Sequence, residues 1–107
     1  MYRFHRTAMA KQSKLQEAFK FAKEMSEYLG TKYAPVKVQA YLEIFGDNGR
    51  IHWYSDYDDL ASVEKITGKI RKDQGYWEIL NKANDVFIEG SIQDTLMQAF
   101  QPQKKNS

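Results

Sequence analysis

The stretch from residue 36 to residue 59 constrains the fold most, because it has the pattern of two alternating strands joined by a tight turn. The sequence Asn48-Gly49 favours a two-residue type I′ turn, since both central residues of that turn need positive φ. If this pair forms the turn, Asp47 faces Arg50. Counting outward predicts the cross-strand pairs Ile44 with Trp53, Phe45 with His52, Glu43 with Tyr54, and Tyr41 with Asp56.

The predicted hairpin has two different faces, because side chains alternate along a strand with a period of two. One face is aliphatic and suited to receiving helices, and it carries Val36, Val38, Ala40, Leu42, Ile44, Ile51 and Trp53. The other face is aromatic and ionisable, and it carries Gln39, Tyr41, Glu43, Phe45, His52, Tyr54 and Asp56.

The rest of the sequence adds a strand and a helix before the hairpin, and a helical segment and a strand after it. Residues 2–9 have strand composition, and helical spacing of apolar residues then runs from a Ser13/Gln16 capping box to Gly30. After the hairpin, Asp58 or Asp59 caps a helical segment that breaks near residues 73–75, where Asp73 caps a second piece. A last strand follows over residues 91–100.

This order predicts an α+β fold of the ferredoxin-like βαββαβ class, as one domain over residues 1–100. Right-handed crossovers place the first and third strands in the centre of a four-stranded antiparallel sheet, with the helices on one face. Residues 101–107 are polar and are expected to form a flexible tail. Trp53 and Trp77 are expected in the core.

Composition narrows the functional classes. The chain has 107 residues, a formal charge of +2 and no cysteine, which excludes disulfides, thiolate metal sites and cysteine nucleophiles. No signal-peptide pattern and no apolar run of membrane-spanning length occur, so we expect a soluble, cytoplasmic protein without a membrane partner.

The predicted fold leaves one sheet face bare, with an area of roughly 500 Å² for four strands of about eight residues. An apolar patch of this size usually marks an interface or a ligand surface. We therefore expect the aromatic face of the sheet to be covered by another molecule.

The layout resembles the dimeric α/β-barrel superfamily, and most of all its small NIPSNAP-like and antibiotic-biosynthesis-monooxygenase-like members. The resemblance covers residues 2–100 and rests on the element order, on Ile51-His52-Trp53-Tyr54, on the helix start at residues 57–62 and on residues 73–77. It implies a homodimer whose two open sheets close an eight-stranded barrel with small-molecule cavities. Members include cofactor-free oxygenases, isomerases, haem enzymes and proteins without a known activity, so the fold does not choose a chemistry.

A cavity on the open sheet face would bind a small apolar or aromatic molecule without a cofactor. The predicted ligand-binding residues are Arg6, Tyr41, Glu43, His52 and Tyr54. On the first strand, Phe4, Arg6 and Ala8 alternate with His5, Thr7 and Met9, and the sequence does not say which set points into the barrel. We favour the set with Arg6, and we expect Asp94 of the last strand to be its ion-pair partner.

Two alternatives remain open. His52 is the candidate catalytic residue of a cofactor-free monooxygenase or isomerase, since a pKa near 6.5 suits proton transfer, although an interface histidine is the plainer interpretation. Residues 50–57 also resemble the aromatic strand of single-stranded RNA-binding domains, but the glycines of that motif are absent and acidic residues share the face, so no nucleic-acid partner is expected. With only His5 and His52, expected on different faces, no metal site is predicted.

Overall fold

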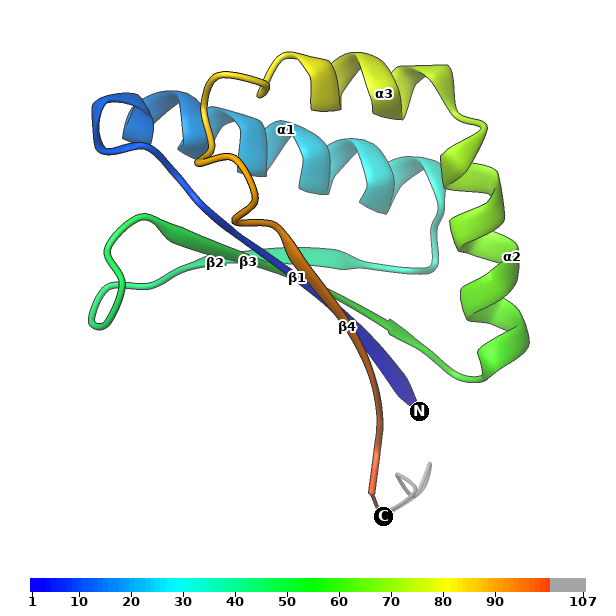
Figure 1. Cartoon of the computed structure of the whole chain (residues 1–107). Helices are drawn as coiled ribbons and strands as arrows, with labels where there is room; N and C mark the ends of the chain where they lie inside the picture. Colours follow the sequence, from blue (N-terminus) through cyan, green and yellow to red (C-terminus); the bar gives the residue numbers. More distant parts are fainter. Residues whose placement is uncertain (101–107) are drawn as a thin grey trace.

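The computed structural model describes residues 1–100 and contains one four-stranded sheet, three α-helices and a short 3-10 helix (Figure 1). The predicted tail, residues 101–107, lies outside the described residues. In chain order the elements are β1 (Tyr2–Met9), η1 (Gln12–Lys14), α1 (Leu15–Lys32), β2 (Val38–Leu42), β3 (Arg50–Tyr57), α2 (Leu60–Arg71), α3 (Gln74–Asn81) and β4 (Gln93–Gln98).

The sheet has the strand order β2-β3-β1-β4, and all its pairs are antiparallel. The first and third strands therefore lie in the centre, and the helices lie on one face of the sheet (Figure 1). This confirms the ferredoxin-like α+β class. None of the helices in residues 1–100 has the length and apolarity needed to cross a membrane.

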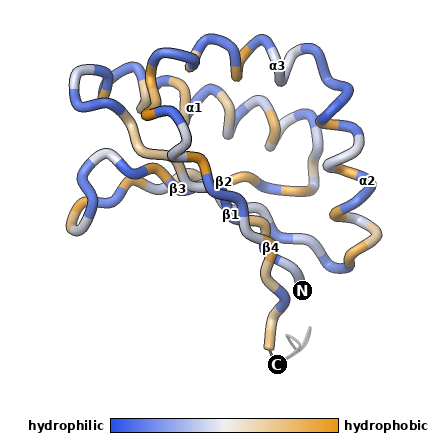
Figure 2. The backbone as a smooth tube through the Cα atoms, in the orientation of Figure 1, coloured by the Kyte–Doolittle hydropathy of each residue, from blue (hydrophilic) through white to orange (hydrophobic). Residues whose placement is uncertain are grey.

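Helix α1 packs on the sheet through one apolar stripe, and polar and apolar residues alternate along it (Figure 2). Phe21 in this stripe makes edge contacts with Trp53 of β3 and with Phe87. Phe19 of the same helix has the helical spacing of a core residue, but its side chain is 42% exposed. The helix continues past Gly30 to Lys32, and no Ser13 capping bond forms.

Two aspartates begin the other helices, as the sequence predicts. The Asp59 carboxylate accepts a hydrogen bond from the Ser62 amide, and the Asp73 carboxylate accepts from the amides of Gly75 and Tyr76. Both therefore satisfy backbone donors that lack a helical partner. The second piece ends at Asn81 rather than near Gly90, and Phe87 instead lies in a bridge with Ala10.

The predicted turn at Asn48-Gly49 forms, since the Arg50 amide donates to the Asp47 carbonyl at 3.0 Å, but it is not of type I′ and the strand pairing predicted from it is wrong. Residues 43–49 form a loop, and Tyr41 pairs with His52 rather than with Asp56. A type I′ turn needs positive φ at two successive residues, but here only Gly49 of the Asn48-Gly49 pair has it. The loop is also tied to the rest of the molecule, because the Ala10 amide donates to the Gly49 carbonyl at 2.9 Å.

The real register differs from the predicted one by four residues, so Tyr41 and His52 keep their predicted face. Ile44 and Phe45, in contrast, leave the sheet altogether. Phe45 lies in the loop with its side chain 93% exposed, so it does not cover His52 as predicted.

Candidate functional site

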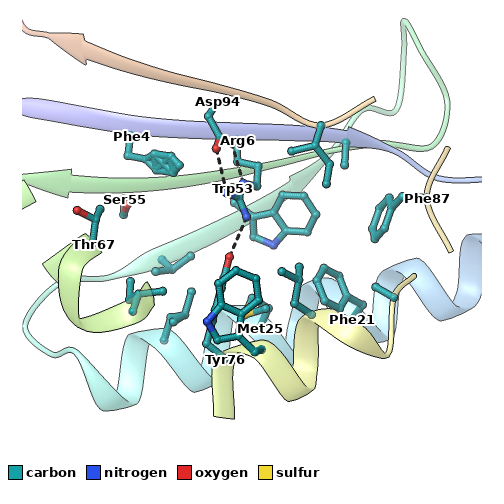
Figure 3. Close-up of a pocket in the computed structure, with 18 of the residues that line it drawn as sticks. Phe4, Arg6, Phe21, Met25, Trp53, Ser55, Thr67, Tyr76, Phe87 and Asp94 are labelled. Atoms are coloured by element: carbon teal, nitrogen blue, oxygen red, sulfur yellow. Dashed lines mark hydrogen bonds and ion pairs between the residues drawn. The ribbon is translucent and has the colours of Figure 1, made fainter. Parts of the chain in front are cut away.

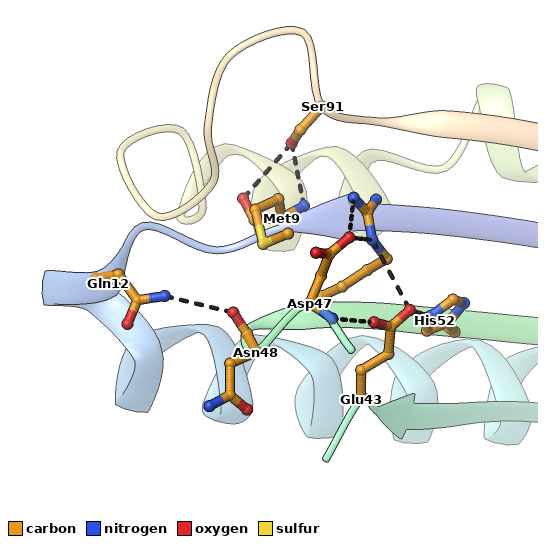
Figure 4. Close-up of polar contacts among 8 residues, drawn as sticks. Met9, Gln12, Glu43, Asp47, Asn48, His52 and Ser91 are labelled. Carbon is orange, nitrogen blue, oxygen red and sulfur yellow. Dashed lines mark hydrogen bonds and ion pairs between the residues drawn. The ribbon is translucent and has the colours of Figure 1, made fainter. Parts of the chain in front are cut away.

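The sheet face away from the helices is called the open face below. Cross-strand partners in register share a face, which assigns to it Arg3, His5, Thr7, Met9, Gln39, Tyr41, Arg50, His52, Tyr54, Asp56, Gln93, Thr95 and Met97. Three of the predicted ligand-binding residues, Tyr41, His52 and Tyr54, lie on it as expected. Glu43 follows the end of β2, and its carboxylate reaches His52 (Figure 4).

Glu43, His52 and His5 form a hydrogen-bonded chain, the open-face triad. His52 Nε2 lies 2.7 Å from Glu43 Oε1, and His52 Nδ1 lies 2.8 Å from His5 Nε2. Hydrogen bonds from His52 and from the Asp47 amide hold the pKa of the Glu43 carboxyl below its ordinary value. The carboxylate is thus the acceptor, and His52 donates to it through Nε2–H.

Both ring nitrogens of His52 are engaged within the triad, so this geometry leaves His52 no free nitrogen for a substrate. Within residues 1–100, the one imidazole nitrogen of the triad that makes no hydrogen bond is His5 Nδ1. Sequence reasoning missed His5, because it placed the opposite set of first-strand residues on this face. The alternation of the strand groups His5 with Arg3 and Thr7, but only the register with β3 shows that this set lies on the open face.

Aromatic and charged groups surround the triad. The His5 ring stacks on Tyr54, with ring centroids 4.4 Å apart and planes within 4°. The Arg3 guanidinium also lies over the Tyr54 ring, 5.3 Å from its centroid. Arg3 binds Asp56 through two hydrogen bonds of 2.8 and 3.0 Å. The open face is therefore more polar than its sequence pattern suggested.

Arg6 lies on the face opposite to the one predicted. It pairs with Trp53, whose ring packs among the helices, so the register turns Arg6 toward the helices and His5 toward the open face. The predicted ion pair with Asp94 does form, at 2.7 and 2.9 Å. This hydrogen bonding raises the pKa of the guanidinium, against the opposing effect of burial.

Arg6 instead borders a cavity between the sheet and the helices (Figure 3). The cavity has a volume of about 1230 Å³ and is lined among others by Phe4, Met25, Trp53, Ile70 and Tyr76. Arg6 Nη1 donates to the Tyr76 hydroxyl at 3.1 Å. This cavity lies behind the sheet, where the helix pair α2 and α3 leaves room, on the face opposite to the one on which a cavity was predicted.

Trp53 lines this cavity and carries a buried polar atom without a partner among residues 1–100. Its side chain is only 9% exposed, and its indole Nε1 is buried without a hydrogen-bond partner among residues 1–100. Trp77, expected in the core, is 43% exposed at the cavity wall, and its own Nε1–H donates to the Arg71 carbonyl. A buried unpaired donor costs about 1–3 kcal/mol, so the Trp53 indole is a position where a ligand acceptor would be favoured.

The described part of the chain holds no group of three or more His, Asp or Glu side chains placed to bind a metal ion. The open-face triad and the cavity behind the sheet are suited to different chemistry. The open-face triad can exchange protons, whereas the cavity can hold an apolar molecule and offer it N–H and O–H donors.

A family model matches residues 3–91, and its description is a family of unknown function (DUF6039). The chain belongs to this family. No functionally curated protein matches this DUF6039 member.

Solved structures share its fold at low sequence identity. A NIPSNAP domain protein from Burkholderia xenovorans is 16% identical with a TM-score of 0.75, over 96% of this chain and 100% of that one. A NIPSNAP family protein from Agrobacterium tumefaciens is 15% identical with a TM-score of 0.74, over 96% and 98%. An antibiotic biosynthesis monooxygenase is 14% identical with a TM-score of 0.70, over 94% and 100%. These matches confirm the predicted resemblance at the level of the fold.

Proposed function

We propose that this DUF6039 protein binds a small apolar or aromatic molecule in the cavity between its sheet and its helices. The ligand would carry an oxygen that accepts hydrogen bonds, such as a ketone or a phenolate. The walls are mostly apolar, which suits a ligand removed from water. The proposal changes the predicted position of the site but keeps the predicted ligand class.

The unpaired indole of Trp53 is the observation that carries this proposal. A second donor lies on the same cavity wall, because the Tyr76 hydroxyl accepts from Arg6 and donates to no group within residues 1–100. Arg6 is fixed by two bonds to Asp94, so it holds the Tyr76 oxygen in place. Two donors and an apolar wall favour an acceptor oxygen on an otherwise apolar ring.

The test uses 1-tetralone as a probe and tetralin, which lacks only the carbonyl, as the matched control. The chain has two tryptophans, so two indole N–H signals appear in a ¹H–¹⁵N spectrum. We expect 1-tetralone to shift the Trp53 signal downfield and leave the Trp77 signal in place, since Trp77 already donates to a carbonyl. Tetralin is expected to bind more weakly without that shift.

A Trp53→Phe variant keeps an aromatic ring but removes the donor, so 1-tetralone should lose its advantage over tetralin. Equal affinity of both compounds for the wild-type protein, or shifts confined to Trp77, would contradict the proposal.

We also propose that a second copy of the chain docks on the open face. The strands have 8, 5, 8 and 6 residues, so two such faces would bury roughly 860 Å² in total before side-chain relief is counted, which is the size of a weak interface. The charges of the face are mixed, since Arg3 pairs with Asp56 and Arg50 pairs with Asp47, so two copies can meet without a block of one sign.

Sedimentation velocity tests the dimer directly. The exposed Tyr41 side chain lies on the open face, and Tyr41→Glu is expected to dissociate the dimer. Phe19→Glu, an exposed aromatic position on α1, is the control and should leave it intact. A wild-type protein that sediments as a monomer at about 100 μM, roughly the weak end of specific association, refutes this proposal.

A further inference from the structure

The open-face triad has a limited capacity for protons. A hydrogen bond between two imidazole nitrogens needs one donor and one acceptor. His5 Nε2 and His52 Nδ1 lie 2.8 Å apart with their ring planes within 6°, so the two rings share one proton along that line. The other side of His52 is fixed as a donor by the Glu43 carboxylate at 2.7 Å.

Three proton states follow from this geometry. With both rings neutral, His52 donates to Glu43 and accepts from His5. With one extra proton, His52 is an imidazolium that donates to Glu43 and to His5, and the adjacent carboxylate stabilises it. With a second extra proton, two N–H groups face each other at 2.8 Å, and the contact between the rings must open.

The surroundings oppose that second proton. Burial, the neighbouring His52 and Arg3 all lower the pKa of His5. Arg3 is itself bound to Asp56, and Arg50 lies 3.8 Å from Glu43 and 3.1 Å from Asp47. The other open-face neighbours are Tyr41 and Tyr54, and the neutral groups Thr7, Gln39, Gln93, Thr95 and Met97.

We propose that the open-face triad is a proton switch that controls the docking of a second copy of the chain on this face. The inference rests on the dimer proposed above. In the closed state His5 lies flat on Tyr54 and its Nε2 is paired. Opening releases a charged ring that needs water, and a docked sheet would bury it without a partner.

The first experiment follows the imidazole nitrogens by NMR from pH 8 to pH 4.5. The chain has only two histidines, so one variant assigns the spectrum. We expect two coupled steps, with the His52 Nε2–H retained through both. His5→Phe, which keeps a ring on Tyr54, should reduce the two coupled steps to one, and Glu43→Gln, which removes the carboxylate acceptor, should abolish the retained Nε2–H signal. Two independent titrations that neither variant moves would overturn the triad.

The second experiment measures the dimer dissociation constant over the same pH range, with circular dichroism confirming that the chain stays folded. Below the pH of the second protonation of the triad, linkage predicts that the dissociation constant rises by up to about tenfold per subunit for each pH unit. His5→Phe should dimerise without this dependence. A dimer whose dissociation constant stays constant while the triad opens would leave the dimer standing and overturn the switch. A monomer at every pH would overturn both the dimer and its control by the triad.

Discussion

Asp73 offers the sharpest test of how the helices are held together. Its carboxylate is 6% exposed and accepts hydrogen bonds from the hydroxyls of Tyr28 and Tyr33, both at 2.7 Å. It also accepts from the amides of Gly75 and Tyr76, and Lys32 lies 3.1 Å away. One side chain thereby joins the end of α1 to the start of α3.

The Asp73→Asn substitution keeps the shape and one acceptor oxygen but removes the charge. A hydrogen bond to a charged group contributes about 1 kcal/mol more than a neutral one, and two tyrosines lose this difference. We therefore expect a loss of about 2 kcal/mol in the free energy of unfolding at pH 7. Asp73→Ala also removes the helix cap and leaves the buried Tyr33 hydroxyl unpaired, so we expect about 4 kcal/mol.

The stabilisation by Asp73 should depend on pH, and the shift of its pKa gives the direction of that dependence. Burial alone would raise the pKa of Asp73, but the bonds from Tyr33, Tyr28 and Lys32 outweigh it and hold the pKa well below its ordinary value. The unfolded chain therefore takes up this proton first as the pH falls. The stabilisation is complete above pH ~4, the pKa of an unfolded aspartate, and is lost progressively below it.

Urea unfolding followed by tryptophan fluorescence at pH 7 and pH 3 measures both effects. The gap between wild type and Asp73→Asn should narrow at pH 3. Asp58→Asn, at an exposed aspartate, is the matched control and should change little. If Asp73→Asn destabilises the protein no more than Asp58→Asn, or if the gap is equal at both pH values, the reasoning fails.

Three other predictions concern single positions. A Cβ at Gly75 would overlap the Tyr28 hydroxyl, so Gly75→Ala should lower the free energy of unfolding by about 1–3 kcal/mol. Gly68 has open space around it inside α2, so Gly68→Ala should raise the free energy of unfolding by up to about 1 kcal/mol. Thermal unfolding of the two variants compares these effects. Burial and the bond to Asp73 raise the pKa of Tyr33 to about 12 from 10.0, so its stabilisation is complete below pH 10 and lost toward pH 12. Tyr33→Phe should lack this loss in alkaline urea titrations. Phe45→Ser should change stability by less than about 0.5 kcal/mol because the ring is 93% exposed, and a larger loss in urea would support the predicted hairpin pairing instead.

The architecture could be predicted because local signals and chain order agree. The alternation in β1 and β3, and the Asp59 and Asp73 caps, are all properties of a few neighbouring residues, and the structure contains each of them. The crossover rule then orders the strands. The Asn48-Gly49 turn is also local and forms, whereas the pairing counted outward from it was wrong, because the loop that contains the turn already begins at residue 43.

The candidate site could be predicted only in part. The face of Tyr41, His52 and Tyr54 follows from alternation within a hairpin, but the face of Arg6 depends on its lateral register with Trp53, which no local pattern specifies. The cavity depends on how far α2 and α3 lie from the sheet. Its key group, the unpaired Trp53 indole, is defined by the absence of a partner in three dimensions, and sequence carries no sign of that.

The four-residue difference in the β2-β3 register also bears on how this loop can change during evolution. A strand shifted by an even number of residues presents the same side chains to the helices, whereas a shift by one would exchange the two faces. A shift of the edge strand β2 by one residue would turn Tyr41 toward the helices, whereas Trp53 and His52 keep their faces because β3 also pairs with β1. Residues inserted into the loop of residues 43–49 can leave the register unchanged, so we expect related proteins to vary freely in the length of this loop while the β2-β3 register changes only in steps of two.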